Sequence, residues 1–492
     1  MKKIICCLLL VVTIFALASC NKEEETDNHY FEAEYILDTA TSSGMDITDE
    51  YSIYTVTIRN DGTMRVFYNR NNTISTRESK YTFDGNTKLE ENYNGTKFEY
   101  TKLDNYLVTN YDDYGELVEI VLILKTEEST NKSVNFESLL FGEDIADTKI
   151  YNYCPAIIMD KDEDGNDRMN IWYCTNKDSG IIVDYIGFRQ GIKQEDGTWL
   201  FSEEQIVLEP TANTWDARHT CDPTVIKGEF KLKGETYNYL MAYLGCTSED
   251  YQKNETGIAV AKNIEGPWVK IDKVNPIVPW YDDGDINTEE AKYQSMQGSP
   301  SIYWGTGMPS LLSVDGKGEV ILLYQSTLRG TGIRRIDLSD LENPVEKYTV
   351  SIKHTGLVNS QNGKCNVGIP DFGYDPVTKR LYMVGVTNER NPADDTKTLV
   401  NSHSVVAYIE NLEDMEAVSD ALQNATYRWN VVGYVGPNET GWERNHNPGL
   451  VKGEYSNICD SSKIQVVVST GRNSWPNENI FTYRLFGWSF DL

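Results

Sequence analysis

Short apolar stretches alternate with polar residues through the first folded part of the chain, residues 30–128. The stretch from Tyr51 to Arg59 alternates apolar positions with Thr or Ser, and the stretch from Leu117 to Leu124 is almost continuously apolar. Turn pairs separate such stretches at short intervals, namely Asp61-Gly62, Asp84-Gly85 and Asn94-Gly95. Because these pairs favour the tight turns of β-hairpins, the pattern predicts an antiparallel meander that closes into a small barrel or sandwich.

A longer pattern recurs five times between residues 134 and 492. Each copy begins with a proline, passes through a loop and reaches a strongly apolar strand; the five prolines are Pro155, Pro223, Pro300, Pro370 and Pro448. Repeats of about 70 residues with four antiparallel strands each predict an all-β, five-bladed propeller over residues 134–492. A proline is tolerated at the start of an innermost strand, so the residues beside these prolines are expected to ring the axis. The fifth copy is short, and residues 134 to 150 are expected to supply its missing strand.

The first residues read as an export signal. Lys2 and Lys3 precede an apolar run that is too short for a bilayer, which predicts a signal peptide over residues 1–19. The ending Leu-Ala-Ser-Cys resembles the bacterial lipobox, which implies that Cys20 is diacylated and begins the mature protein. Residues 20–29 are polar and acidic and read as a tether. They resemble the export signal of Bacteroidetes surface lipoproteins, which implies a lipid-anchored protein at the outer membrane or cell surface; a plain spacer is the alternative.

The net charge of the chain limits the classes of partner that it can bind. Asp and Glu number 75 against 45 Lys and Arg, so the net charge is −30 and the sequence pI is near 4.6. This charge excludes electrostatic binding to nucleic acid or to anionic lipid as the main role, and contact with a membrane is expected through the lipid anchor only. Aromatic residues make up 11% of the chain, which suits both β-structure and stacking against sugars. No pattern indicates an oligomer, so a monomer is expected.

The first folded part also resembles a known class of domain. Its order of strands and Asp-Gly turns, with the segment Tyr81 to Gly85 and the Tyr-rich hairpins that follow, is similar to the lipocalin-like domains of bacterial lipoproteins. The resemblance implies a β-barrel over residues 30–128 whose mouth could hold a small apolar ligand. A spacer that lifts the rest of the chain from the membrane is the alternative.

The propeller region resembles an enzyme family. The segment from His219 to Ile226, the apolar strand after it and the blade ending Gly266-Pro267-Trp268 are similar to the five-bladed propeller glycoside hydrolases of family 43. The resemblance implies hydrolysis of a glycosidic bond by three acids: an Asp base, a tuning Asp two blades later, and a Glu acid on the next blade. By this resemblance Asp222 takes the place of the base and Asp371 that of the tuning residue. The chemistry needs one ionised and one protonated group, so their environments must separate their pKa values.

The acid of this family pattern is missing. The sequence has Asn447 before Pro448 where the pattern expects Glu. Two nearby residues are possible substitutes, Glu443 and His446. Because of this departure, a propeller that binds glycan without cutting it stays open as the alternative to an enzyme.

Further residues are candidates for contact with a sugar. Aromatic residues in predicted loops could form a stacking platform, namely Trp280, Trp304 and Trp442. Polar residues beside the predicted axis could contact the same ligand, namely Cys154, His219, Ser299 and Asn447.

No cofactor is required by these motifs. The run from Asp160 to Asp167 alternates carboxylates as calcium loops do, but Ile171 stands where an EF-hand has Glu, which favours an ordinary hairpin turn. Calcium in the axial channel is a separate possibility that the family resemblance implies. No other metal site is predicted, since the chain has no Cys-x-x-Cys pair.

The sequence allows the cysteines to be either bridged in disulfides or free. Cys154 and Cys174 in the first repeat occupy places that match Cys221 and Cys246 in the second, so a bridge within each repeat is conceivable. Free buried thiols are the alternative, because cross-strand disulfide geometry is strict.

Overall fold

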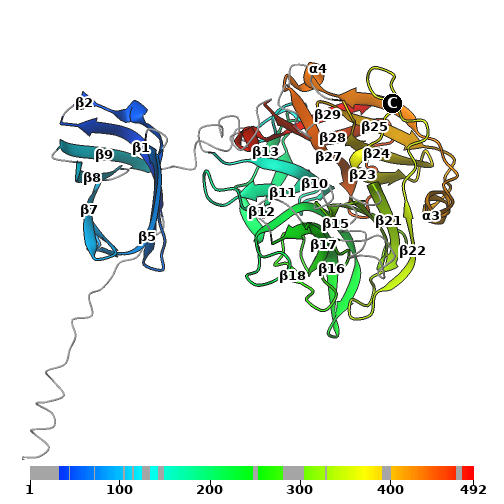
Figure 1. The fold of residues 1–492 in the computed structure, drawn as a ribbon, viewed down its shortest axis with the longest axis horizontal. Helices are drawn as coiled ribbons and strands as arrows, with labels where there is room; N and C mark the ends of the chain where they lie inside the picture. The colour runs from blue at the N-terminus through cyan, green and yellow to red at the C-terminus, as the bar shows by residue number, and fades with distance from the viewer. Residues whose placement is uncertain are drawn as a thin grey trace, which may run out of the picture. The chain divides into compact units, whose positions relative to one another are not determined.

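The structure is a computed structural model that describes residues 33–43, 45–70, 73–103, 106–113, 116–124, 133–141, 149–247, 253–280, 304–326, 330–389, 401–472 and 479–492. The chain divides into two compact units, Met1–Ser129 and Thr130–Leu492. The described residues of both units lie mainly in β-strands, as predicted (Figure 1). Within the described ranges, no helix has the length and hydropathy needed to cross a membrane. The predicted signal peptide, the tether with Cys20, and Ser299 lie outside the described residues.

The first unit is a single antiparallel sheet that closes on itself. Its strands follow one another in sheet order from β3 to β9, and β1 pairs with both β3 and β9. Apolar side chains such as Val56, Val66 and Leu122 fill the interior. The described elements are β1 (Ala33–Ser42), β2 (Met45–Asp46), η1 (Thr48–Glu50), β3 (Tyr51–Ile58), β4 (Thr63–Arg70), β5 (Thr73–Phe83), β6 (Lys88–Tyr93), β7 (Thr96–Leu103), β8 (Tyr106–Asp113) and β9 (Glu116–Leu124).

The predicted hairpin turn at Asp61-Gly62 forms. Asp61 accepts the backbone N–H of Thr63, and Gly62 takes φ 81°, a left-handed value that glycine adopts without steric cost.

The interior of the first unit also holds an ion pair, in which Arg77 donates two hydrogen bonds to the fully buried carboxylate of Glu91. Tyr100 donates to the same carboxylate, so the buried charge is compensated.

The second unit is a five-bladed propeller, which confirms the predicted architecture (Figure 1). Three blades are separate four-stranded sheets, and the first and fifth share one sheet because β10 and β27 pair in parallel at Ile157 and Val451. The strands of blades one to three are β10 (Asn152–Lys161), β11 (Asp167–Asn176), β12 (Asp184–Lys193), β13 (Trp199–Phe201), β14 (Gln205–Leu208), β15 (His219–Leu232), β16 (Glu235–Cys246), β17 (Glu255–Ala261), β18 (Val269–Lys270), β19 (Thr306–Ser313), β20 (Glu319–Ser326), β21 (Gly330–Asp337) and β22 (Val345–Ser351).

Blades four and five complete the ring. Their elements are β23 (Gly368–Asp375), β24 (Arg380–Val386), β25 (Ser404–Ile409), α3 (Met415–Asn424), β26 (Asn430–Val435), α4 (Pro437–Thr440), β27 (Arg444–Gly453), β28 (Lys463–Gly471), η6 (Asn479–Thr482) and β29 (Arg484–Asp491). Asp414 caps α3 by accepting the N–H of Ala417. Apolar side chains of neighbouring blades, such as Leu240 and Leu322, pack in one buried cluster between the sheets.

The edge of the fifth blade contacts the start of the same unit. Leu140 donates its backbone N–H to Leu485 at 3.0 Å, and Gly487 donates to Ser138 at 3.0 Å. A side chain at Gly487 would meet the backbone oxygen of Phe136 at 2.2 Å, so glycine permits this close approach. The early segment therefore covers the exposed edge of β29, an edge that would otherwise be open to another strand.

The third repeat begins later than its sequence pattern predicts. Its innermost strand is β19, in which Pro309 takes the place expected for Pro300. Ser310 to Ser313 pair with β20 in the register Leu311 opposite Leu322. The sequence pattern was ambiguous because two Pro-Ser segments precede the apolar strand β20, and only the one in sheet register forms the blade.

Candidate functional site at the propeller axis

The innermost strands of all five blades surround one small cavity on the axis. Its lining comes from the residues at and beside the five inner prolines: Cys154, Pro155, Ala156, Asp222, Pro223, Thr224, Met308, Pro309, Ile369, Pro370, Asp371, Asn447 and Pro448. The cavity has a volume of about 30 Å³, which is room for a water molecule and not for a sugar ring. A larger ligand would therefore have to reach these residues from the mouth of the channel.

Every inner strand carries the same backbone distortion at this cavity. The residue before each proline has a positive φ, with 52° at Cys154, 48° at Asp222, 49° at Met308, 54° at Ile369 and 44° at Asn447. In each blade the pairing of the first two strands also shifts at this point, as in a β-bulge. Residues before proline normally avoid this region, so tertiary packing must hold five strained residues around one axis.

Asp222 is the most perturbed acid of this ring. Its residue is 5% exposed, and its carboxylate oxygen lies within 4.8 Å of the Cys154 sulfur. Burial raises the pKa of Asp222 to about 7, and the nearby charge of Asp184 adds to the increase. The carboxyl can therefore exchange a proton near neutral pH, as a general acid or base must.

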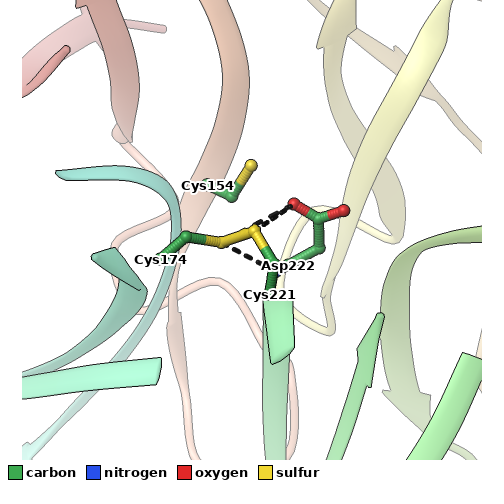
Figure 2. A group of neighbouring side chains, drawn as sticks. All are labelled: Cys154, Cys174, Cys221 and Asp222. Atoms are coloured by element: carbon green, nitrogen blue, oxygen red, sulfur yellow. Dashed lines mark hydrogen bonds between the residues drawn. A yellow bond between two sulfur atoms is a disulfide. The ribbon is translucent and has the colours of Figure 1, made fainter. Parts of the chain in front are cut away.

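A disulfide contacts both the backbone and the side chain of Asp222. Cys174 of blade one and Cys221 of blade two are bridged, and Figure 2 shows their sulfurs beside the Asp222 carboxyl. The Asp222 backbone N–H donates to the Cys174 sulfur at 2.9 Å, and the Cys221 sulfur lies 3.3 Å from the carboxyl. The bridge therefore holds both the backbone and the side chain of Asp222 in place.

This bridge corrects the pairing within repeats that the sequence suggested. Tyr153, not Cys154, lies opposite Cys174, because the bulge before Pro155 displaces Cys154 from the ladder. Cys154 and Cys365 are free buried thiols, Cys459 is a free thiol at the surface, and Cys246 is buried. Local strand pairing was the wrong guide because the partner of Cys174 comes from the neighbouring blade.

Removing this bridge should destabilise the propeller. The bridge closes a loop of sequence separation 47, for which chain entropy predicts a loss of about 4 kcal/mol in unfolding free energy. The check is urea unfolding of Cys174→Ala/Cys221→Ala against wild type, with Cys246→Ala as the control for loss of a buried thiol. Peptide mapping without reductant should recover the Cys174–Cys221 pair; recovery of Cys154–Cys174 or Cys221–Cys246 would contradict this connectivity.

Candidate metal ligands gather at only one place among the described residues. The ligand atoms of Cys154, Cys174, Cys221 and Asp222 lie within 4.8 Å of one another. Two of these sulfurs share the disulfide, and sulfur does not suit calcium, which prefers oxygen ligands. The cluster therefore does not support calcium on the axis.

The acidic run near Asp160 forms a hairpin turn. Asp162 accepts the backbone N–H groups of Asp164 and Asn166, and Asp160 pairs with Arg168 at 2.6 Å. Asp167 pairs with Lys161. These contacts use the carboxylates to fix the turn, as in other Asx turns.

Asp371 contacts the same cavity from blade four, but in another way. It follows its proline, whereas Asp222 precedes its own, so the two are not at equivalent positions. Its carboxylate accepts from Ser310 at 2.6 Å, from the backbone N–H of Leu450 at 2.8 Å and from the Lys452 ammonium at 2.7 Å. Asp371 thus ties blades three, four and five together through a buried ion pair.

The two substitutes for the missing acid lie in different environments. His446 is 7% exposed, and burial lowers its pKa to about 4, so its ring is neutral at neutral pH. Glu443 is partly exposed and pairs with Arg472 at 3.4 Å. The Arg472 guanidinium also lies 4.2 Å from the centre of the Trp442 ring. Trp442, Glu443 and Arg472 together form what we call the Trp442 surface cluster.

The other predicted contact residues are dispersed. Asn447 lines the axial cavity, and Trp304 packs against the cluster of Cys154, Cys174 and Cys221. His219 is fully buried, where its Nδ1 accepts the backbone N–H of Asp184 at 3.1 Å. The backbone N–H of Trp280 donates to Glu255.

Some residues of the site could not be anticipated from the motif. Met308 and Asp184 act on Asp222 only because distant strands converge at the axis. Lys452 gave one usable signal, since it follows the apolar residues Leu450 and Val451 in a fully buried inner strand. A buried lysine of this kind needs an acidic partner, and Asp371 supplies it.

Comparison with known proteins is informative only for the fold. No family model and no curated protein matches the chain. The chain is similar to a family 117 glycoside hydrolase of the marine bacterium Zobellia galactanivorans, with 11% identity, 74% of this chain and 90% of that chain covered, and a TM-score of 0.41. It is also similar to a thermostable family 43 glycoside hydrolase (13% identity, 69% and 89% covered, TM-score 0.37) and to an α-L-arabinofuranosidase of Podospora anserina (10%, 74% and 96%, TM-score 0.39). Similarity at these identities concerns the fold and gives no information about the chemistry of the site.

Proposed function

We propose that the propeller hydrolyses a glycosidic bond of a poly- or oligosaccharide at the mouth of its axial channel. The observation that carries this proposal is the Asp222 carboxyl, which lines the axial cavity beside the Cys174–Cys221 disulfide and has its pKa raised to about 7. A carboxyl poised in this way can take a proton from an attacking water while another group protonates the leaving oxygen. Asp371 lines the same cavity and pairs with the Lys452 ammonium at 2.7 Å.

Aromatic side chains of the propeller would stack against the sugar in this proposal. Trp304 packs beside the cysteine cluster, and the Trp442 surface cluster presents an aromatic ring with an acid and a cation. Rings of this kind stack against apolar sugar faces, and Glu443 and Arg472 can bind hydroxyl groups.

The identity of the proton donor can be tested by two variants. Glu443→Gln should lower kcat by about 10²-fold or more if Glu443 protonates the leaving group, with little change in stability because its ion pair is exposed. His446→Gln should then change kcat much less, since the buried ring is neutral and serves to orient Asn447. The measurement is kcat on an aryl glycoside and on a natural glycan, because a good leaving group needs no acid. A large loss for His446→Gln alone would instead assign the donor to His446.

A glycan-binding propeller without catalysis is the second candidate. It is favoured by the contacts of the Asp371 carboxylate, which accepts from Ser310, from Leu450 and from Lys452. Of the two acids that line the cavity in the described part of the chain, Asp222 alone is then left to react. The two candidates differ in one measurement, sugar release from a panel of plant and host polysaccharides, followed in parallel with binding by calorimetry. Binding without release by the wild-type protein would reject the enzyme.

We further propose that the protein works as a monomer at the outer membrane or cell surface, anchored by lipid at Cys20. The resemblance of the first twenty residues to a lipobox and the acidic run after them support this location. The net charge of −30 supports a neutral or cationic partner such as a carbohydrate, and not nucleic acid. The closed sheet of the first unit serves as a lipocalin-like spacer in this scheme.

A further inference from the structure

We propose that Cys154, Cys174 and Cys221 form a thiol–disulfide exchange site, in which the bridge passes between Cys174–Cys221 and Cys154–Cys221. The exchange does not depend on the proposed hydrolysis, because it involves only groups of the protein itself. It gives Cys154 a chemical role different from the direct sugar contact that the sequence suggested.

A free thiol lies beside the bridge. The sulfurs of Cys154, Cys174 and Cys221 lie within 4.8 Å of one another, and all three residues are buried (Figure 2). Cys174 and Cys221 are bridged, whereas Cys154 keeps its thiol. Sulfur atoms at this separation are close to contact, so a small rotation of the Cys154 side chain brings its sulfur against the bridge. A thiol in this place can attack the disulfide from within the protein.

The surroundings of the bridge favour attack at Cys221 rather than at Cys174. The backbone N–H of Asp222 donates to the Cys174 sulfur at 2.9 Å, and a hydrogen bond of this kind stabilises a departing thiolate. The Asp222 carboxylate lies 3.3 Å from the Cys221 sulfur and 3.8 Å from the Cys174 sulfur, so it repels a thiolate more strongly at Cys221. The Tyr153 hydroxyl lies 3.1 Å from the Cys221 sulfur, which stays bridged throughout. Cys174 is therefore the better leaving group.

The exchange balances without an oxidant or a reductant. The Cys154 sulfur forms a bond to the Cys221 sulfur, while the bond from Cys221 to Cys174 breaks and leaves its electron pair on Cys174. The thiol proton of Cys154 ends on Cys174, and the Asp222 carboxyl can carry it because its oxygen lies within 4.8 Å of all three sulfurs. The product again holds one bridge and one thiol. The covalent link between blades one and two thereby moves from β11 to the axial strand β10.

Blade five holds Cys154 in place for this attack. The Asn447 amide donates to the Cys154 sulfur, which favours its thiolate form, and the Cys154 N–H donates to the Ser469 hydroxyl at 2.9 Å. Burial raises the pKa of Cys154, and the charges of Asp222 and Asp184 add to the increase. Because the thiolate is the attacking form, the exchange is slow at neutral pH and faster in mild alkali.

Disulfide mapping of the folded full chain tests the exchange. The protein is incubated at about pH 8.5, unfolded in acid, which stops the exchange, and mapped without reductant. The Cys154–Cys221 bridge is expected in about 1–10% of the chains, beside the main Cys174–Cys221 bridge. The matched control Cys154→Ser lacks the third sulfur and should show the Cys174–Cys221 bridge alone.

Two further variants test which sulfur is attacked. After refolding with oxidised glutathione as the oxidant, Cys174→Ser should form the Cys154–Cys221 bridge. Its urea midpoint should then exceed that of Cys154→Ser/Cys174→Ser, because the link between the blades is restored. Cys221→Ser should form much less of a Cys154–Cys174 bridge.

Three results of the mapping would overturn the proposal. Absence of the Cys154–Cys221 bridge from the wild-type protein after incubation would exclude the exchange. A Cys154–Cys174 bridge in its place would exclude attack at Cys221. Equal amounts of bridges to Cys459, which lies at the surface, would assign the product to scrambling in the unfolded chain and exclude exchange in the folded protein.

Discussion

Asp222→Asn is expected to abolish sugar release, with a loss of about 10²–10⁴-fold in kcat, while glycan affinity changes little. The amide has nearly the same shape as the carboxyl but cannot take a proton from water. Initial rates on the best glycan of the panel, together with calorimetric binding, are the measurements. Asp184→Asn is a matched comparison, because it removes a nearby buried acid that affects Asp222 only through its charge. Retained activity in Asp222→Asn would exclude Asp222 as the reacting group.

The same variant makes a prediction about stability that does not depend on activity. The pKa of Asp222 is raised from 3.8 to about 7 on folding, so between these pH values the folded state holds a proton that the unfolded state has released. The contribution of this group to stability is therefore lost as pH rises from about 4 to 7. Unfolding free energies at pH 5 and pH 7 should fall less steeply in Asp222→Asn than in wild type. Equal slopes would mean that the carboxyl is not perturbed.

Lys452→Met should destabilise the propeller by about 3–5 kcal/mol, because it leaves the Asp371 carboxylate buried without its cation. The Lys452 side chain is 4% exposed and that of Asp371 13%, so water cannot replace the missing charge. Urea unfolding of the variant against wild type measures the loss. A matched surface change, Lys463→Met on the same blade, should cost far less because that side chain is only partly buried.

The double variant Asp371→Asn/Lys452→Met measures how strongly the two charges interact with each other. It removes both charges and should be more stable than Lys452→Met alone, since a buried pair can often be replaced by neutral groups without large loss. If the two single changes instead add up in the double variant, Lys452 and Asp371 do not interact and the link between blades four and five lies elsewhere.

The sequence predicted most of the fold because local patterns determine it. Asp-Gly turns and alternating strands mark the first unit, and the recurrence of a proline before an apolar strand marks the blades, since each hydrophobic face must be buried against a similar neighbour. The error at Pro300 shows the limit of such patterns. Two Pro-Ser segments fit the same rule, and only pairing with β20 selects Pro309.

The sequence placed four residues at the axial cavity but did not predict their contacts. Asp222, Asp371, Asn447 and Cys154 all line the axial cavity, as the proline rule suggested. Whether they can react depends on neighbours from other blades, and these are far away in the chain. The Cys174–Cys221 bridge crosses between blades, and Lys452 reaches Asp371 over 81 residues, so no local pattern could reveal either contact.

The sequence alone thus determined the all-β class, the two units, the number of blades and the axial prolines of four blades, because hydrophobic periodicity and turn residues act over short distances. Only the tertiary structure decided which cysteines are bridged, that Asp371 is paired, and that Asp222 has a pKa near neutrality. The physical reason is that a pKa and an ion pair depend on burial and on the nearest charges, and here both are set by strands that meet only at the propeller axis.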